Sequence, residues 1–456
     1  MSDTDSETLT DSQGALTHDD LQRPFLEVCK PPQEWRVGIE AERIGLIAQR
    51  GEPIHYDGPA GILSLFEAFV EQYGWKPESE MPGGPVLSLH RGEAAITLEP
   101  GSQFELSGAP HHSLHALAAE VRDHARELHA VSEPLGIRWL GLGFHPLARQ
   151  DQLGWVPKFR YGIMRVYLAT RGTGAHDMMR RTATVQANFD YGSLDDAMRK
   201  LRVALRLSPL VSTIFANSPL VEGRPFGGKS YRMKVWLDVD PDRQGLLPTV
   251  WNENSTVNDY ITWALDAPMF LIKRGDTFVE NTGQTFRSFM NDGFGKHRAT
   301  LSDWALHLNT LFPEVRLKRT LEVRGADSVP LALMPSLPAL WTGLLYDDRA
   351  LQEAEALSAG WRYDDVQRLR SQAAMEGLAA SFEGSPLAGI AERVIDIARD
   401  GLMRRAILDE SGQDERVHLA PIAALVERGR TPADDVLDGL QRPGPIHENL
   451  LASSPA

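Results

Sequence analysis

Glutamates spaced two apart in segments that alternate polar and apolar residues carry the strongest chemical signal in this sequence. In RVGIEAERI, Glu40 and Glu42 fall on one face of an expected strand, because successive strand side chains point to opposite faces. Acidic residues are depleted in strands, and two carboxylates on one face repel each other. A divalent cation between them removes the repulsion, and Mg²⁺ takes carboxylate oxygens as ligands. The pair therefore suggests a metal site.

Three further glutamates lie in or beside similar segments. Glu105 lies in QFELS, Glu99 precedes the Pro100–Gly101 turn, and Glu322 lies in RLKRTLEVRG, which we read as one strand. If these strands converge, their charge exceeds that of one Mg²⁺, so we expect two or three ions bridging the phosphates of ATP, with Mn²⁺ as a substitute. No GxxxxGK[ST] loop is present to hold phosphates. The alternative, a merely solvated polar face on each strand, stays open at this point.

Three arginines can supply the positive half of such a site. Arg160 lies in PKFRYGIM, Arg232 lies in SYRMKVW, and Arg324 follows Glu322 by two. Arginine binds carboxylate or phosphate through paired hydrogen bonds. We expect Arg232 and Arg324 to lie on polar strand faces outside the core, although a single arginine is usually a surface residue. Trp236, four residues after Arg232, reads more naturally as a core residue than as a substrate wall.

Composition excludes several classes of function. Lys and Arg number 47 against 62 Asp and Glu, a net charge of −15, which argues against binding nucleic acid or an anionic membrane. No apolar run is long enough to span a bilayer. The acidic segment 1–22 lacks an apolar signal region and is expected to be a disordered tail. Cys29 is the only cysteine, so no intrachain disulfide can form and a cytoplasmic location is expected.

Amphipathic patterns predict helices around the alternating segments. We expect them over 59–75, 111–135 and 387–402, after a capping Ser193, and from Pro432 through Leu440 as the last helix. After Pro335 the chain reads as mainly helical. These helices are expected to support the site and not to take part in the chemistry. No nucleophile elbow, Cys/His pair or zinc-ligand spacing is present, so covalent catalysis has no support.

Eight motifs in order make the sequence resemble glutamate–cysteine ligases of the plant and proteobacterial type. They are TLEPGSQFELSGAP, GLGFHP, PKFRYGIM, RTATVQANFDY, FANSPLVEGRP, SYRMKVWLDVDPDRQGLLP, FPEVRLKRTLEVRGAD and LPALWTGLLYDD. The resemblance runs from about residue 36 to 440. It implies an α+β fold like that of glutamine synthetase, in which a funnel-shaped antiparallel sheet has helices packed outside and the C-terminal part is helical. It also implies one catalytic domain over 23–445, with 335–445 mainly helical and 446–456 as a tail.

The resemblance also implies roles for individual residues. Glu40, Glu42, Glu99, Glu105 and Glu322 resemble the family's Mg²⁺ ligands, with Gln186 in the nucleotide and metal region. Arg160, Arg232 and Trp236 resemble the residues that bind glutamate, and Arg324 resembles the arginine directed at the transferred phosphate, with Glu322 beside it. Two departures stand out. Ala41 occupies the place of a plant histidine, on the opposite strand face, and the paired cysteines of plant redox control are absent.

The implied reaction is ATP- and Mg²⁺-dependent joining of the γ-carboxylate of L-glutamate to L-cysteine through γ-glutamyl phosphate. The product, γ-glutamylcysteine, belongs to glutathione-type thiol synthesis. Two alternatives remain: a γ-glutamyl ligase of the same fold that uses another amine, and an inactive metabolite-binding protein. A crowd of mutually repelling carboxylates argues against the inactive protein. We expect only small-molecule partners, with the chain acting as a monomer or weak homodimer.

Overall fold

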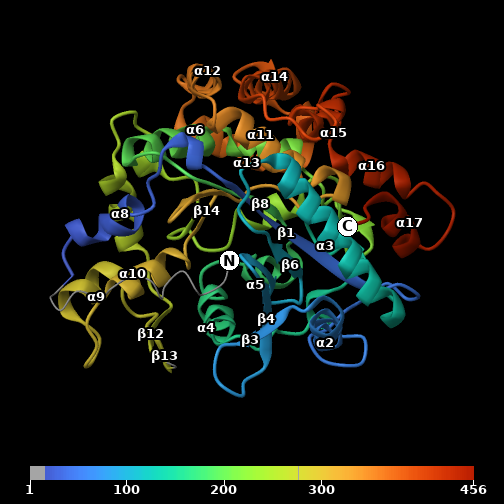
Figure 1. Cartoon of the computed structure of the whole chain (residues 1–456), viewed down its shortest axis with the longest axis horizontal. Helices are drawn as coiled ribbons and strands as arrows, with labels where there is room; N and C mark the ends of the chain where they lie inside the picture. The colour runs from blue at the N-terminus through green and yellow to red at the C-terminus, as the bar shows by residue number, and fades with distance from the viewer. Residues whose placement is uncertain (1–15, 276) are drawn as a thin grey trace.

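One antiparallel sheet lies at the centre of the computed structural model, which describes residues 16–275 and 277–456 (Figure 1). Within these residues the sheet has ten strands, and their order across it is β15 (Val315–Leu317), β16 (Leu321–Val323), β8 (Val185–Phe189), β1 (Val37–Ile47), β6 (Phe104–Ser107), β5 (Ala94–Leu98), β4 (Val86–Arg91) and β3 (Lys76–Ser79). The remaining two strands, β7 (Ile137–Leu140) and β2 (Glu52–Pro53), pair with the last residues of β1. The predicted antiparallel sheet is confirmed.

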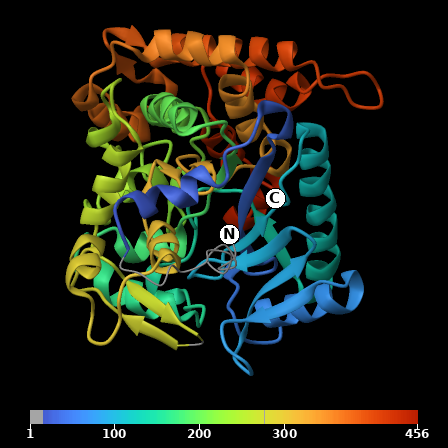
Figure 2. The same ribbon diagram turned by 60° about the vertical axis from the view of Figure 1, so that its left-hand side comes forward.

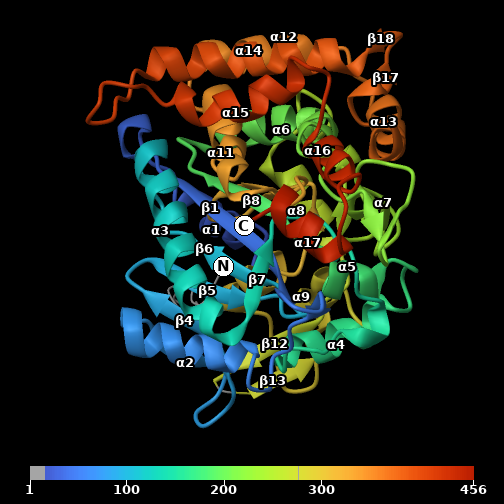
Figure 3. The same ribbon diagram turned by 90° about the vertical axis from the view of Figure 1, so that its right-hand side faces the viewer.

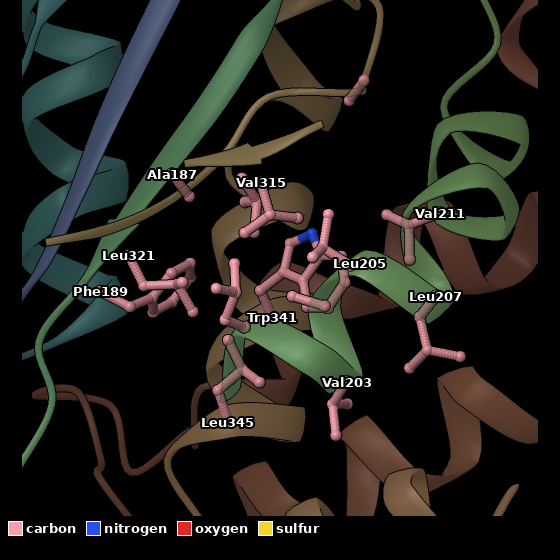
Figure 4. Close-up of a cluster of buried hydrophobic side chains, with 14 of the residues drawn as sticks. Ala187, Phe189, Val203, Leu205, Leu207, Val211, Val315, Leu321, Trp341 and Leu345 are labelled. Atoms are coloured by element: carbon pink, nitrogen blue, oxygen red, sulfur yellow. The ribbon is translucent and has the colours of Figure 1, made fainter. Parts of the chain in front are cut away.

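The apolar face of the sheet packs against helices. These helices are α3 (Leu114–Ser132), α6 (Leu194–Ile214) and α11 (Ser336–Leu345). Figure 4 shows part of this core, where apolar side chains of β8, β15 and β16 meet those of α6 and α11. The labelled side chains are all almost fully buried: Ala187, Phe189, Val203, Leu205, Leu207, Val211, Val315, Leu321, Trp341 and Leu345. Because one strand face is committed to this core, the other face is free to form a site.

Local signals account for several helix ends. Ser193 caps α6 by accepting a hydrogen bond from the Asp196 amide at 3.1 Å, as its position predicts. The expected helix over 59–75 is α2 (Ile62–Tyr73), which ends at Gly74 with φ of +69°. The one expected over 111–135 is α3. The pattern over 387–402 corresponds to α14 (Leu387–Arg405).

The C-terminal part is helical, as predicted. Its first four helices form a layer over α6 and α11, and its last two pack on each other beside β7 (Figure 3). Its helices are α12 (Asp348–Ser358), α13 (Tyr363–Glu376), α14, α15 (Arg416–Val426), α16 (Pro432–Gly439) and α17 (Ile446–Ser453). Pro432 begins α16 as expected, but α16 is not the last helix. The expected tail 446–456 contains α17, whose Leu450 is buried, and the amide of Ala456 donates to the carbonyl of Trp139 at 3.3 Å.

The expected N-terminal tail, 1–22, lies largely outside the described residues. Within its described part, 16–22, Leu21 is fully buried. Across residues 16–275 and 277–456, no helix combines the length and apolar character that crossing a bilayer would require.

The polar face of the sheet is enclosed by shorter elements, which Figure 2 shows below and beside it. They are α4 (Phe159–Leu168), α5 (Ala175–Arg181), α7 (Tyr231–Val235), α10 (Leu301–Leu308), β12 (Leu271–Arg274) and β14 (Phe312–Pro313). The remaining elements are α1 (Arg23–Leu26), α8 (Val257–Asp266), α9 (Phe286–Asp292), β9 (Leu220–Val221), β10 (Arg224–Pro225), β11 (Gln244–Gly245), β13 (Thr277–Glu280), β17 (Ser381–Phe382) and β18 (Ser385–Pro386).

The segment RLKRTLEVRG is not one strand, which corrects the prediction. It forms the β15–β16 hairpin, in which Arg316 lies opposite Glu322 and Leu317 lies opposite Leu321. Directly opposed residues of an antiparallel pair share a face. The polar residues of the two strands therefore still share one face. The turn, however, places the first half of the segment beside the second half.

Candidate active site

A cavity of about 130 Å³ lies on the polar face of the sheet. Nine of the ten residues predicted for the site line it: Glu40, Glu42, Glu99, Glu105, Arg160, Gln186, Arg232, Trp236 and Arg324. The tenth, Glu322, is fully buried behind this lining. The structure thus brings together residues that lie almost 300 positions apart in the chain.

Strand register places the first carboxylates. On β1, Glu42 lies directly opposite Glu105 of β6, and Glu40 lies directly opposite Gln186 of β8. The side chains of opposed residues on one sheet face are close neighbours. Glu99 follows β5 in a tight turn, where the amide of Ser102 donates to the Glu99 carbonyl at 3.0 Å. This turn brings Glu99 back toward β6.

Three carboxylates converge here. Glu42, Glu99 and Glu105 each offer an oxygen within 4.8 Å of the other two. The Thr184 amide donates to Glu42 at 3.0 Å. The hydroxyls of Thr97 and Ser107 donate to the two oxygens of Glu105 at 2.7 and 2.8 Å. These contacts orient an all-oxygen set of the kind that hard divalent cations prefer.

Electrostatics also favour a cation at this acidic trio. Burial, and then the charges of Glu99 and Glu105, raise the pKa of Glu42 well above its ordinary value. Burial and the charge of Glu105 likewise raise the pKa of Glu99, although Arg160 opposes the rise. Such carboxylates resist being charged together in a buried site. A divalent cation relieves this conflict, so these residues fit the predicted metal.

Glu40 is connected to the β15–β16 hairpin and not to the acidic trio. The Asn188 side-chain nitrogen donates to Glu40 at 2.9 Å, and the Thr320 hydroxyl donates to the side-chain oxygen of Asn188 at 3.0 Å. Beside Glu40, the buried Oε1 of Gln186 has no hydrogen-bond partner among the described residues. A buried acceptor without a donor is costly, which makes Gln186 a natural contact for a bound molecule.

Glu322 is surrounded by cations. Arg316 binds both of its oxygens, at 2.6 and 2.9 Å, while Lys318 and Arg324 approach to 3.2 and 2.7 Å. Although burial opposes ionisation, these three charges hold the pKa of Glu322 well below its ordinary value. We call Arg316, Lys318 and Arg324 the basic wall. All three line the cavity.

Arg232 is not on a strand, which corrects the prediction. It is the second residue of helix α7, only 5% exposed, and its guanidinium donates to the carbonyls of Gly325 and Arg324 at 2.7 and 2.9 Å. Four residues later, Trp236 forms part of the cavity wall, and its indole Nε1 is buried without a partner among the described residues. Trp236 therefore lies at the site and does not belong to the core alone.

Arg160 comes from helix α4 on the far side of the cavity. Its guanidinium carbon lies 5.3 Å from the ring centre of Tyr161, whose hydroxyl donates to the Leu98 carbonyl at 2.7 Å. This bond ties the start of α4 to the end of β5, one residue before Glu99. Arg160 and Glu99 therefore face the cavity from adjoining positions.

Comparison with known proteins decides the family. Residues 36–453 match the profile of glutamate–cysteine ligase family 2. The chain belongs to this family. It is 41% identical to the chloroplastic glutamate–cysteine ligase of Brassica juncea, over 96% of this chain and 84% of the relative. It is 40% identical to the Arabidopsis thaliana enzyme, over 96% and 83% of the two chains.

A solved structure supports the fold of this family member. The glutamate–cysteine ligase of Francisella tularensis, solved in complex with AMP, aligns with a TM-score of 0.57 and 12% identity. The alignment covers 92% of this chain and 87% of that one. At this identity the likeness establishes the shared fold.

Two residues that line the cavity of this family member were not predicted from the sequence as site residues. Arg316 and Lys318 fall on the polar face of RLKRTLEVRG with Glu322, but a single-strand reading places them far from it. The turn residues 318–320, Lys-Arg-Thr, include none of the Gly, Pro, Asn, Asp or Ser residues that usually mark the end of a strand, so the sequence carried no sign of the turn. Asp327 ends the motif FPEVRLKRTLEVRGAD, but nothing in the motif assigned it a role.

Proposed function

We propose that this protein is an ATP-dependent glutamate–cysteine ligase whose chemistry takes place in the cavity on the polar sheet face. The observation that carries the proposal is the meeting of the acidic trio and the basic wall in one cavity. Family membership supplies the two amino acids that are joined. The AMP complex of the Francisella tularensis relative supports an adenine nucleotide as co-substrate.

In the first step, an oxygen of the glutamate γ-carboxylate attacks the γ-phosphorus of ATP. The bond to the bridging oxygen breaks, and ADP leaves with its electron pair. Arg324, with Arg316 and Lys318 beside it, stabilises negative charge on the transferred phosphoryl group. Arg160 and Arg232 hold the carboxylate groups of glutamate, and Trp236 limits the space around its carbon chain.

In the second step, the amine nitrogen of cysteine attacks the acyl carbon of γ-glutamyl phosphate. The C–O bond to phosphate breaks, phosphate leaves, and the amine loses a proton as the amide forms. The chain contributes mainly by placing the reactants and by keeping water away from the acyl phosphate.

Glu42, Glu99 and Glu105 would hold Mg²⁺, with Glu40 completing the acidic side of the cavity. The ion would neutralise charge on the ATP phosphates. Both oxygens of Glu322 are bonded to the basic wall, so Glu322 first serves to orient Arg324. Its role as an additional metal ligand stays a prediction, because a metal could bind Glu322 only if one of these cations gave up its bond to the carboxylate.

The remaining assignments are also proposals. We propose that the catalytic domain starts near residue 23 and extends through 453, because α17 packs on the sheet region through Leu450 and the C-terminal bridge to Leu140. We also propose a cytoplasmic location, with which the single, half-buried Cys29 agrees, and a monomer or weak homodimer. Size-exclusion chromatography with light scattering tests the oligomeric state.

Product analysis tests the function. Protein supplied with ATP, Mg²⁺, glutamate and cysteine should release ADP and phosphate in equal amounts with γ-glutamylcysteine, identified by mass spectrometry. Replacing cysteine by other amino acids should lower ADP release. Faster turnover with another amine would favour the alternative γ-glutamyl ligase, and no turnover with any amine would favour an inactive binding protein.

A further inference from the structure

Asp327 is a fully buried carboxylate that does not line the cavity. It accepts three hydrogen bonds: from the Asn217 amide at 2.7 Å, the Ser218 hydroxyl at 2.7 Å and the Ser230 hydroxyl at 2.9 Å. Its nearest cation is Arg232, with Nη1 at 4.0 Å from Oδ1. The carboxylate thus has a fixed orientation set by three donors, and it faces a residue of the cavity.

The donors around Asp327 define the start of helix α7. Ser230 is the N-cap of α7, because its hydroxyl oxygen accepts from the Met233 amide at 3.0 Å. The hydroxyl oxygen of Ser218 accepts from the Arg232 amide at 3.1 Å. Asp327 therefore holds both hydroxyls that anchor the first turn of α7, and this turn carries Arg232.

The guanidinium of Arg232 is attached to the same segment that carries Asp327. It donates to the carbonyls of Arg324 and Gly325, three and two residues before Asp327. Burial lowers the pKa of Arg232, and the charges of Asp327 and Glu42 oppose that change. Both the backbone and the side chain of Arg232 are thus placed relative to Asp327.

The surroundings leave Asp327 little room to move. A Cβ atom added at Gly143 would lie 2.2 Å from Cγ of Asp327. That close approach requires glycine at position 143. A longer carboxylate at 327 would not fit, so asparagine is the only close replacement by shape.

We infer that Asp327 is a positioning residue for glutamate binding: it sets the start of α7 and directs Arg232 at the substrate carboxylate. This inference rests on the proposed function, in which Arg232 binds glutamate. Asp327 would act only through Arg232 and would not touch the substrate. The ATP phosphates, held on the basic wall, should be little affected.

Asp327→Asn tests this role, because it keeps the size of the side chain and removes its charge. The KM for glutamate should rise at least ~10-fold, since small misplacements of a substrate-binding group have large effects. The KM for ATP and kcat should change less than about threefold. Ser230→Ala removes one donor to Asp327 and keeps the charge, so it should raise the glutamate KM in the same direction by a smaller factor.

Glu415→Gln is the matched control. Glu415 is also fully buried, accepts from the Leu114 amide at 2.6 Å and pairs with Arg405 at 3.2 Å, but it lies in the helical layer. It should lower the melting temperature and leave both KM values unchanged. If it raised the glutamate KM as much as Asp327→Asn does, Asp327 would have only a general structural role and the inference would be overturned.

Two further outcomes are decisive. If Asp327→Asn does not fold, an unchanged glutamate KM in Ser230→Ala overturns the inference. Arg232→Ala tests the proposed role of Arg232 in binding glutamate, on which the inference rests. An unchanged glutamate KM there overturns the proposed role of Arg232 and this inference together, whereas a raised KM there with an unchanged KM in Asp327→Asn overturns the inference alone.

Discussion

Arg316 and Glu322 lie opposite each other across the β15–β16 hairpin, and the Arg316 guanidinium binds both oxygens of the Glu322 carboxylate. Lys318 and Arg324 bind the same carboxylate. Three cations around one anion leave a net positive charge on this side of the cavity. The acidic trio lies apart from this hairpin, on β1, β6 and the turn after β5. The proposed metal and the ATP phosphates would therefore bind at different ends of the cavity.

Glu322→Gln should destabilise the protein as well as lower its activity. Two buried cations, Arg316 and Lys318, and the partly buried Arg324 lose their shared counter-charge, and removing one partner of a buried ion pair costs about 3–5 kcal/mol. Chemical denaturation should measure this loss, and kcat should fall at least ~10²-fold as Arg324 loses its anchor. Glu52→Gln, which breaks the exposed pair with Arg50, should cost under about 1 kcal/mol. Equal losses of unfolding free energy in the two variants would contradict the proposal that Glu322 neutralises the basic wall.

Glu42→Gln should abolish metal-dependent activity and stabilise the metal-free protein. Glutamine is neutral without a proton, whereas the buried Glu42 must hold a proton to be neutral in the metal-free fold. A melt in chelator at neutral pH should therefore move to higher temperature than for the unchanged protein. With Mg²⁺ or Mn²⁺, kcat should fall at least ~10²-fold, and calorimetry should show weaker metal binding. Full turnover of the unchanged protein in chelator, or a loss of kcat below threefold in Glu42→Gln, would refute the assignment of a metal to the trio.

Mg²⁺ binding should release protons and tighten as pH rises. The folded, metal-free protein holds protons on Glu42 and Glu99 at pH values where the unfolded chain has lost them, because both pKa values are raised. Its stability should therefore decrease as pH rises through those values, and the metal must displace the same protons. Calorimetry in two buffers of different ionisation enthalpy measures the release. A dissociation constant independent of pH would refute this coupling.

Arg232→Ala and Arg324→Ala should have different kinetic effects. Arg232 is proposed to hold a carboxylate of glutamate in both ground and transition states, so its loss should raise the glutamate KM and spare the KM for ATP. Arg324 is proposed to face the phosphoryl group in transfer, so its loss should mainly lower kcat. Lysine at either position should rescue only partly.

The stability of these two variants should differ as well. Arg232→Ala leaves the carbonyls of Arg324 and Gly325 without their donors and Asp327 without its cation, so its melting temperature should drop. The positions expected from the sequence, on polar strand faces outside the core, would have left the fold of both variants intact. The reverse kinetic pattern, with Arg232 controlling kcat and Arg324 controlling the glutamate KM, would mean that glutamate and ATP bind in the opposite orientation.

Oxidants and dithiothreitol should leave the rate unchanged. Cys29 has no second cysteine to pair with, and burial, together with the charge of Asp196, raises the pKa of its thiol. Its thiolate is therefore scarce at neutral pH. Reversible inactivation by oxidant that disappears in Cys29→Ser would reveal an intermolecular or mixed disulfide.

The sequence by itself determined which residues share a face. Period-two alternation is a local property of a strand, so Glu40 with Glu42, and the polar positions around Glu105 and Gln186, could be assigned without knowing any neighbour. The start signals of α6 and α16 are local in the same way, because the cap Ser193 and the first-turn Pro432 act within one helical turn. The family motifs then supplied a role for each predicted residue.

The tertiary structure alone decided how those faces meet. Register across β1 and β6 set Glu42 against Glu105, and a turn brought Arg316 and Lys318 around Glu322. Arg160 and Arg232 reach the cavity from helices, and Asp327 acts from outside it through hydrogen bonds to residues about a hundred positions away. These relations depend on long-range packing, because a side chain's partner across a sheet or a helix contact leaves no trace in its own local pattern.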